Sequence, residues 1–111
     1  MRLKPLLTAS ALALAAAPAV AQDKTINIAG FGASSGVVGI FGQNSGAAMA
    51  AAVEKINAEG GVTLADGSKA MLVTQYYDDR CNAEEGISVL RRIASTDAVV
   101  AVGPTCSNVA E

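Results

Sequence analysis

The chain has 111 residues, a formal net charge of −2, and neither histidine nor tryptophan. A mildly acidic chain lacks the basic patches that bind nucleic acids or anionic membrane surfaces, so neither partner is expected. Without histidine, the chain lacks the most common metal ligand and the usual general base near neutral pH, which disfavours a metal site or a simple acid–base enzyme.

The chain begins with a pattern typical of a secretory signal peptide, residues 1–21. Arg2 and Lys4 form a basic start, Leu6 to Ala17 is largely apolar, and small residues precede a cleavage point after Ala21. A membrane anchor is the alternative, but polar residues interrupt this stretch, and it is shorter than the ~20 apolar residues that span a bilayer. We therefore expect export to the periplasm and a mature chain, residues 22–111, that does not insert into the membrane.

The start of the mature chain predicts a strand, a loop and a helix. Thr25–Gly30 is β-branched and apolar and ends at a glycine. We expect a glycine-rich loop over residues 31–42, then a helix over about residues 44–58 that ends at Gly60-Gly61. Four helix residues form an apolar stripe that would face a sheet: Met49, Ala52, Val53 and Ile56.

The next segment predicts a turn, a strand and a second helix. Asp66-Gly67 is a turn signal that indicates a small hairpin before a strand over about residues 70–77. Asn82 and Glu85 form a capping-box pattern at the start of the second helix. The apolar stripe expected on this helix comprises Ile87, Leu90, Ile93 and Ala94.

The last segment predicts a third strand over residues 98–103, a tight loop, and the first turn of another helix over residues 108–111. The order β-α-β-α-β favours the α/β class, with a parallel sheet, right-handed crossovers and helices on its faces. A third strand without a helix to cover it would leave apolar surface bare. We therefore expect the chain to be a part of a longer protein.

The two cysteines, Cys81 and Cys106, each follow a predicted strand. If those strands are neighbours in one parallel sheet, both sulfurs lie at the same edge, where open α/β sheets bind their ligands. Two cysteines in an exported chain favour a disulfide over the alternative of two free, buried thiols.

Two further motifs favour structural roles. Residues 30–36 follow the first strand and suggest a dinucleotide-binding loop, but the sixth position of that fingerprint is Ser35 instead of glycine. Asp78 and Asp79 could belong to a cation pocket, but hard cations need several more oxygen ligands. We therefore expect solvated loop carboxylates, no metal and no cofactor.

All four aromatic residues lie at or just past the ends of the first two predicted strands: Phe31, Phe41, Tyr76 and Tyr77. Aromatic walls are typical of small-molecule pockets, although alternation along a strand requires one of the two tyrosines to pack in the sheet. Because Phe41 lies in the glycine-rich loop, we expect it to contact a ligand.

Thr105, Cys106 and Ser107 precede the last predicted helix. Unpaired backbone N–H groups and the positive end of the helix dipole make this position suited to a carboxylate. An ordinary helix cap is the alternative role of Ser107, and the two roles are compatible.

Five segments of the chain together carry a family resemblance: Ile26–Gly30, Ser35–Gly42, Ile56–Val62, Tyr77–Asn82 and Val102–Ser107. In these segments, and in their order, the chain resembles the branched-chain amino-acid (Leu/Ile/Val) periplasmic binding proteins, the receptors of ABC importers. The resemblance extends over essentially all of residues 25–111.

The resemblance implies that residues 22–111 are the incomplete amino-terminal lobe of a type I, Venus-flytrap binding protein that closes on an amino acid or a related small polar solute. By position, Cys81 and Cys106 match the family's disulfide. Ser107, with the backbone around Thr105 and Cys106, matches the clamp on the ligand's carboxylate and amino groups, and Phe41 matches an aromatic residue of the side-chain pocket. The implied protein partner is an ABC transporter permease, and no enzymatic activity is implied.

Two other functions remain open on the residues alone. The same lobe fold could form the ligand-binding ectodomain of a sensor, either a receptor or a regulator. An exported α/β enzyme would need a nucleophile–base pair, and Ser34, Ser35 and Ser107 have no histidine in this chain to activate them.

Overall fold

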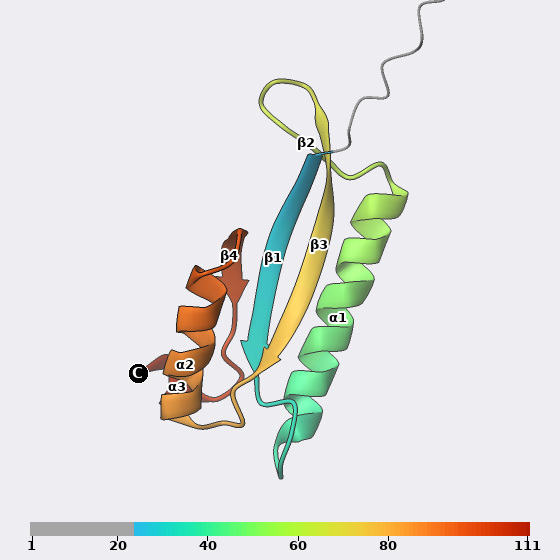
Figure 1. Cartoon of the computed structure of the whole chain (residues 1–111). Helices are drawn as coiled ribbons and strands as arrows, with labels where there is room; N and C mark the ends of the chain where they lie inside the picture. The colour runs from blue at the N-terminus through green and yellow to red at the C-terminus, as the bar shows by residue number, and fades with distance from the viewer. Residues whose placement is uncertain (1–23) are drawn as a thin grey trace, which may run out of the picture.

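A computed structural model of the protein describes residues 24–111 (Figure 1). The predicted signal peptide, residues 1–21, lies outside the described residues. The elements are β1 (Lys24–Gly32), α1 (Gly39–Ala58), β2 (Val62–Thr63), β3 (Lys69–Asp78), α2 (Ala83–Ala94), β4 (Ala98–Val102) and α3 (Ser107–Ala110).

The four strands form one sheet in the order β2-β3-β1-β4. β1 is central and pairs in parallel with both β3 and β4, whereas β2 pairs with β3 in the antiparallel direction. The α/β class is therefore confirmed, but the sheet is mixed and the plain β-α-β-α-β order is not observed. The added strand arises because the Asp66-Gly67 turn folds Val62–Thr63 back onto Lys69 and Ala70.

The two longer helices lie on opposite faces of the sheet (Figure 1). α1 connects β1 to β3, and α2 then connects β3 to β4 across the other side of β1. The connection from β1 to β3 moves toward one edge of the sheet, and the connection from β3 to β4 moves toward the other edge. Because both crossovers are right-handed, their helices lie on opposite faces.

α1 begins at Gly39, five residues before the predicted start, and so shortens the predicted loop. The N–H of Gly42 donates to the carbonyl of Ala33 (2.9 Å), and the Gln43 side chain donates to the carbonyl of Ser34 (3.0 Å). A Cβ at position 42 would collide with the Ala33 carbonyl. Close packing of the helix start against the preceding loop therefore overrides the low helix propensity of glycine.

The inner face of α1 follows the predicted stripe with one exception. Met49, Val53 and Ile56 are half-buried, whereas Ala52 is exposed. Among the described residues, the sheet surface beside Ala52 has no second helix over it.

The predicted stripe of α2 is wrong except for Ile93. The buried residues of α2 are Gly86, Val89 and Ile93, while Ile87 and Leu90 are 52% and 40% exposed. A Cβ at position 86 would collide with the Val109 side chain, so glycine lets α3 pack against this side of the helix. Apolar residues cover a wide arc of α2, and tertiary contacts decide which part of that arc is buried.

The main core lies between the sheet and α2. Its buried residues are Ala29, Phe31, Tyr77, Val89 and Ile93. The valines of β4, in contrast, are exposed: Val99, Val100 and Val102 are 70%, 47% and 51% exposed. β4 is an edge strand of the sheet within residues 24–111.

Asn57 extends the hydrogen bonding of β3 beyond the end of β2. Its side-chain amide donates to the carbonyl of Leu72 and accepts from the N–H of Leu72, both at 2.8 Å. The side chain thus replaces a neighbouring strand at a position where two backbone groups would otherwise lack partners.

Replacing Asn57 by alanine should lower the free energy of unfolding by about 2 kcal/mol, because two hydrogen bonds to partly buried backbone groups are lost. Urea denaturation of the chain measures this loss. Asn44→Ala, at an exposed position of the same helix, is the matched control and should change stability by less than about 0.5 kcal/mol. Equal effects of the two substitutions would contradict the role of the Asn57 amide.

Candidate functional site

The carboxyl ends of β1, β3 and β4 meet at one edge of the sheet, where a disulfide joins Cys81 to Cys106. The two Cα atoms are 5.5 Å apart. The expectation of neighbouring strands is wrong, however, because β1 lies between β3 and β4. The loop after β3 passes over the end of β1, where the N–H of Asp79 donates to the carbonyl of Gly32 (3.2 Å).

Two consecutive aspartates turn the chain toward the disulfide. Asp78 accepts a hydrogen bond from the N–H of Arg80, and Asp79 accepts one from the N–H of Cys81, both at 2.9 Å. Arg80 and Cys81 adopt positive φ angles of 54° and 57°, a conformation that non-glycine residues rarely adopt. Side-chain hydrogen bonds of this Asx-turn type stabilise the tight turn and direct Cys81 toward Cys106.

The two aspartates lie in different environments. Asp79 is fully buried, so the expectation that both carboxylates are solvated is wrong for this residue. Its second oxygen, Oδ2, has no hydrogen-bond partner among residues 24–111. Within the same residues, no group of three or more His, Cys, Asp or Glu side chains could hold a metal ion.

Asp78 fixes the loop between β1 and α1. Its carboxylate accepts hydrogen bonds from the N–H of Ser34 (2.9 Å) and from the hydroxyl of Ser35. Desolvation acts to raise the pKa of Asp78, but the hydrogen bonds from Ser35, Ser34 and Arg80 together lower it below its ordinary value. One carboxylate therefore connects the loop after β1 with the loop after β3.

The predicted ligand residues lie at this edge but do not share one pocket. Thr105 is half-buried, and its hydroxyl accepts from the N–H of Ala33 (2.9 Å). The N-cap of α3 is Cys106, which makes no side-chain capping bond. Ser107 is therefore not the helix cap; it is the first residue of α3, and it is exposed. Phe41 lies in the first turn of α1 and is 63% exposed.

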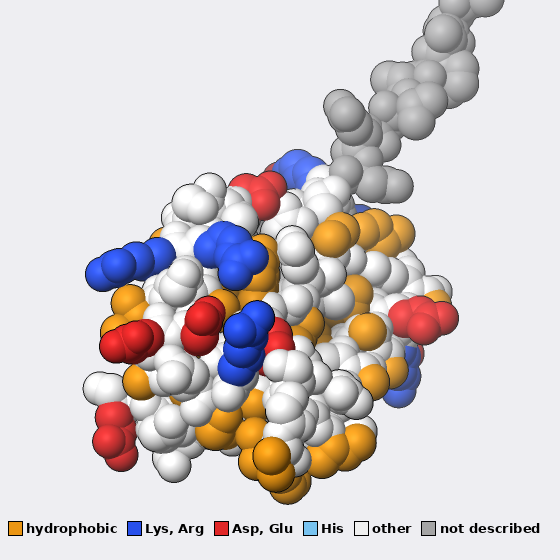
Figure 2. Space-filling model, turned by 60° about the horizontal axis from the view of Figure 1, so that its bottom comes forward, with side chains coloured by type: hydrophobic (Ala, Val, Ile, Leu, Met, Phe, Trp, Pro, Cys, Tyr) orange, Lys and Arg blue, Asp and Glu red, His pale blue; other side chains and the backbone are white. Residues whose placement is uncertain are grey.

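Phe41 belongs to an exposed apolar patch at the start of α1. Val37 and Ile40 are 103% and 56% exposed. When the lower end of the molecule in Figure 1 is brought forward, hydrophobic side chains gather at the lower edge of the surface (Figure 2).

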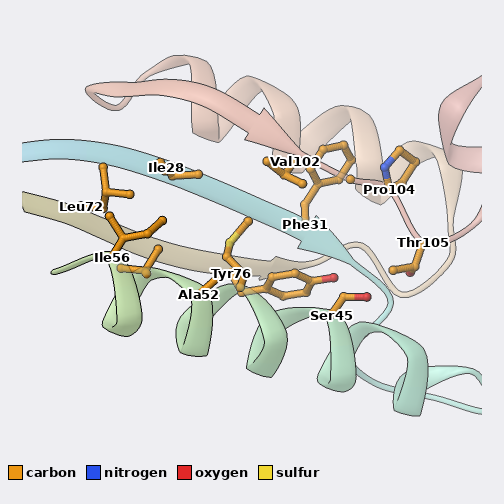
Figure 3. Close-up of a pocket in the computed structure, with 13 residues that line it drawn as sticks. Ile28, Phe31, Ser45, Ala52, Ile56, Leu72, Tyr76, Val102, Pro104 and Thr105 are labelled. Atoms are coloured by element: carbon orange, nitrogen blue, oxygen red, sulfur yellow. The ribbon is translucent and has the colours of Figure 1, made fainter. Parts of the chain in front are cut away.

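An apolar groove of about 630 Å³ lies between α1 and the strands β1, β3 and β4 (Figure 3). Its apolar lining includes Ile28, Met49, Ala52, Val53, Leu72 and Val102. Its polar end is formed by Ser45, Tyr76 and Thr105, so only Thr105 of the predicted ligand residues lines it.

Tyr76 and Tyr77 separate to opposite faces, as strand alternation predicts. Tyr77 is buried in the core, where Arg92 of α2 lies 5.4 Å from its ring centre. Tyr76 lines the groove on the α1 side (Figure 3), where its buried hydroxyl lies beside the Ser45 side chain. Burial raises the pKa of Tyr76, the negative charge of Asp79 adds to that effect, and the Ser45 side chain acts to lower the pKa.

Gly32 allows two hydroxyl groups to converge at the polar end of the groove. A Cβ at this position would lie 2.6 Å from the Tyr76 hydroxyl and 2.7 Å from the Thr105 hydroxyl. Any larger residue would displace both side chains. We expected Gly32 in the glycine-rich loop, whereas β1 continues to Gly32, so this close approach of two hydroxyl groups was not predicted.

No helix in the described part of the chain is long and apolar enough to cross a membrane.

Comparison with curated proteins identifies relatives that are all named as amino-acid-binding proteins. The chain is 34% identical to a leucine-, isoleucine-, valine-, threonine-, and alanine-binding protein of Pseudomonas aeruginosa, over 96% of this chain and 27% of that protein. It is 33% and 32% identical to the Leu/Ile/Val-binding proteins of Escherichia coli K12 and Citrobacter freundii, over 81% and 80% of this chain and 23% of each relative. The chain thus spans about a quarter of the length of these relatives. No protein-family model matches it.

Removing the disulfide through a Cys81→Ser/Cys106→Ser double substitution should lower the free energy of unfolding by about 3 kcal/mol, since the bridge closes a loop with a sequence separation of 25. Urea denaturation with and without a reducing agent measures this effect. The reducing agent should destabilise the oxidised native chain and leave the double variant unchanged. A native chain that is insensitive to reduction would contradict the expected role of the bridge.

The lowered pKa of Asp78 predicts a pH dependence of stability. A depressed pKa in the folded state stabilises the fold above the ordinary aspartate pKa of 3.8, and this contribution is lost as pH falls through the folded-state value. The difference in unfolding free energy between about pH 6 and about pH 3 should therefore be smaller in Asp78→Asn than in the native chain.

Asp66 titrates in the same range, because hydrogen bonds from Lys24 and Ser68 lower its pKa to about 2. The comparison is therefore made in an Asp66→Asn background. If Asp78→Asn leaves the acid sensitivity of that background unchanged, the assigned role of Asp78 is wrong.

Proposed function

We propose, from the confirmed resemblance of this chain to the branched-chain amino-acid binding family, that residues 22–111 form the first part of the amino-terminal lobe of a periplasmic solute-binding protein. The observation that carries the proposal is the similarity to Leu/Ile/Val-binding proteins over nearly the whole chain. The position of the disulfide supports it, because the bridge lies at the sheet edge where open α/β folds bind ligands.

The proposed ligand is a branched-chain or related amino acid, held at the rim of the sheet. Ser107 and the backbone around Thr105 and Cys106 would bind its carboxylate and amino groups through charge-assisted hydrogen bonds. Phe41 would contact the apolar side chain of the ligand. Its 63% exposure is consistent with this role, since an exposed aromatic ring is available for contact.

The disulfide and the Asp78 carboxylate connect the three loops of this proposed site to one another. The bridge connects the loop that carries Thr105 and Ser107 to the loop after β3. Asp78 in turn connects the loop after β3 to the loop that precedes Phe41. Loops held in one arrangement before binding lose less conformational entropy when the ligand arrives, which favours affinity.

We further propose that the protein acts without catalysis and without a cofactor, and that it delivers its ligand to the permease of an ABC importer. Export through the predicted signal peptide would place it in the periplasm. Loss of Arg2 and Lys4 would enlarge the excess of acidic over basic residues, which is 10 to 8 in the whole chain. Such a charge balance suits a soluble carrier of small molecules better than a binder of nucleic acids or anionic membranes.

The test is isothermal titration of the full-length natural protein with leucine, isoleucine and valine. Ser107→Ala should weaken binding by about 10-fold or more, because a hydrogen bond to a charged group is lost. Ser88→Ala, at an exposed position of α2, is the control and should bind like the native protein. Residues 22–111 alone should bind at best very weakly, since most of the proposed clamp would be absent.

Two results would contradict the proposal. Failure of the full-length protein to bind any of these amino acids would remove the proposed ligand class. Micromolar leucine binding by residues 22–111 alone would show that the site does not require a second lobe.

A further inference from the structure

Ser107, the proposed contact for the ligand's carboxylate, lies between two residues that are each joined to Cys81. On its amino-terminal side, Cys106 forms the disulfide with Cys81. On its carboxyl-terminal side, the side-chain amide of Asn108 donates a hydrogen bond to the Cys81 carbonyl (3.0 Å). The turn after β3 therefore holds both chain neighbours of Ser107, one through a covalent bond and one through a side-chain amide.

The Asn108 amide binds a residue with an uncommon backbone conformation. Cys81 has a φ angle of 57°, which a non-glycine residue keeps only where surrounding contacts hold it. Its N–H donates to the Asp79 carboxylate (2.9 Å), and its carbonyl accepts from Asn108. Side chains thus bind both backbone groups of Cys81, and neither of these two bonds involves the sulfur.

The oxygen of the same amide lies beside the Cys81 sulfur. The distance from Asn108 Oδ1 to Cys81 Sγ is 3.6 Å. In the disulfide this sulfur carries no hydrogen, so the contact is not a hydrogen bond. A free Cys81 thiol would carry one, and a thiol is a weak donor whose large sulfur atom suits a distance of this length. Without the bridge, the Asn108 amide would therefore hold Cys81 through two atoms instead of one.

Other noncovalent contacts hold the two ends of the segment that contains Ser107. At one end, the Thr105 hydroxyl accepts from the N–H of Ala33 (2.9 Å). At the other end, the Val109 side chain packs against Gly86 of α2, and Figure 1 shows α3 beside the start of α2. Within residues 105–109, the disulfide and the Asn108 amide are the contacts that reach the turn after β3.

We infer that Asn108 is a positioning residue of the proposed ligand clamp, which holds Ser107 in place independently of the disulfide. The clamp is then ordered both when Cys81 and Cys106 are bridged and when they are free thiols. This inference rests on the proposed function, because the place of Ser107 matters for affinity only if Ser107 binds the ligand. Loss of both connections leaves the segment to be ordered by the ligand itself, which lowers affinity.

The test is a double-mutant cycle in the full-length natural protein with Asn108→Ala and Cys106→Ser. Asn108 is exposed, so its replacement should not prevent folding. A dithiol reductant is added to the Cys106→Ser proteins alone and keeps their Cys81 thiol free. Isothermal titration with leucine should give a Kd within about 2-fold of the native value for each single variant. The double variant should bind about 10-fold more weakly or worse, which exceeds the product of the single effects.

Amide hydrogen exchange of the ligand-free proteins measures the order of the segment without leucine. The N–H groups of Ala33 and Val109 bind the Thr105 hydroxyl (2.9 Å) and the Cys106 carbonyl (3.1 Å). Both amides should exchange about 10-fold faster or more in the double variant than in either single variant, because their bonds break when the segment detaches.

Asn44→Ala is the matched control, since it makes the same substitution at an exposed position of α1. Combined with Cys106→Ser, it should neither speed the exchange of these two amides nor weaken leucine binding beyond the effect of Cys106→Ser alone.

Three results would overturn the inference. The first is equal exchange rates in Cys106→Ser with and without Asn108→Ala. The second is an affinity loss of the same size for Asn108→Ala in the bridged and unbridged proteins, which a general loss of structure would produce. The third is faster exchange in a double variant that still binds leucine like the single variants. Coupled exchange rates in a protein that binds no leucine would instead contradict the proposed function alone.

Discussion

The described fold depends on the parallel pairing of β1 with β3 over nine residues, from Lys24 opposite Ala70 to Gly32 opposite Asp78. This register makes both strands end at the same edge. β4 pairs with the other side of β1, so a third strand ends there as well. Every loop of the candidate site leaves the sheet from one of these three ends.

Because β1 is central, the loops after β3 and β4 are joined to each other across the end of β1. Because β3 and β4 are not neighbours, no backbone ladder joins their loops directly. The Cys81–Cys106 disulfide supplies that connection, and Asp78 and Asp79 shape the turn that makes it possible. The edge is thus held by one covalent bond, by the carboxylate hydrogen bonds of Asp78 and Asp79, and by the bond from the N–H of Ala33 to the Thr105 hydroxyl.

The structure distributes its buried and exposed apolar surface unevenly. Between the sheet and α2 the packing is close, and Val89 is fully buried. On the α1 side, and along β4, aliphatic side chains stay accessible. This difference gives residues 24–111 two kinds of surface: a polar rim at the carboxyl ends of the strands and an apolar groove beside α1.

Local patterns in the sequence were sufficient for the kinds of element and for most of their bounds. Runs of apolar and β-branched residues predicted the strands, the Asn82–Glu85 capping pattern predicted the N-cap of α2, and the Asp66-Gly67 turn predicted the hairpin. The bond from the N–H of Glu85 to the Asn82 side chain is the capping contact expected. These features depend on residues close in sequence, so they can be recognised without the rest of the fold.

Only the tertiary structure decided the sheet order, the buried face of α2, the burial of Asp79 and the groove position of Tyr76. Each depends on contacts between residues far apart in the chain, such as Ala33 with Thr105 or Gly86 with Val109. A sequence pattern with a period of two or 3.6 residues shows that one face is apolar, but it does not show which segment will cover that face. For that reason the sequence determined the class of the fold and the presence of two cysteines available for pairing, and the three-dimensional packing determined which strand their bridge crosses.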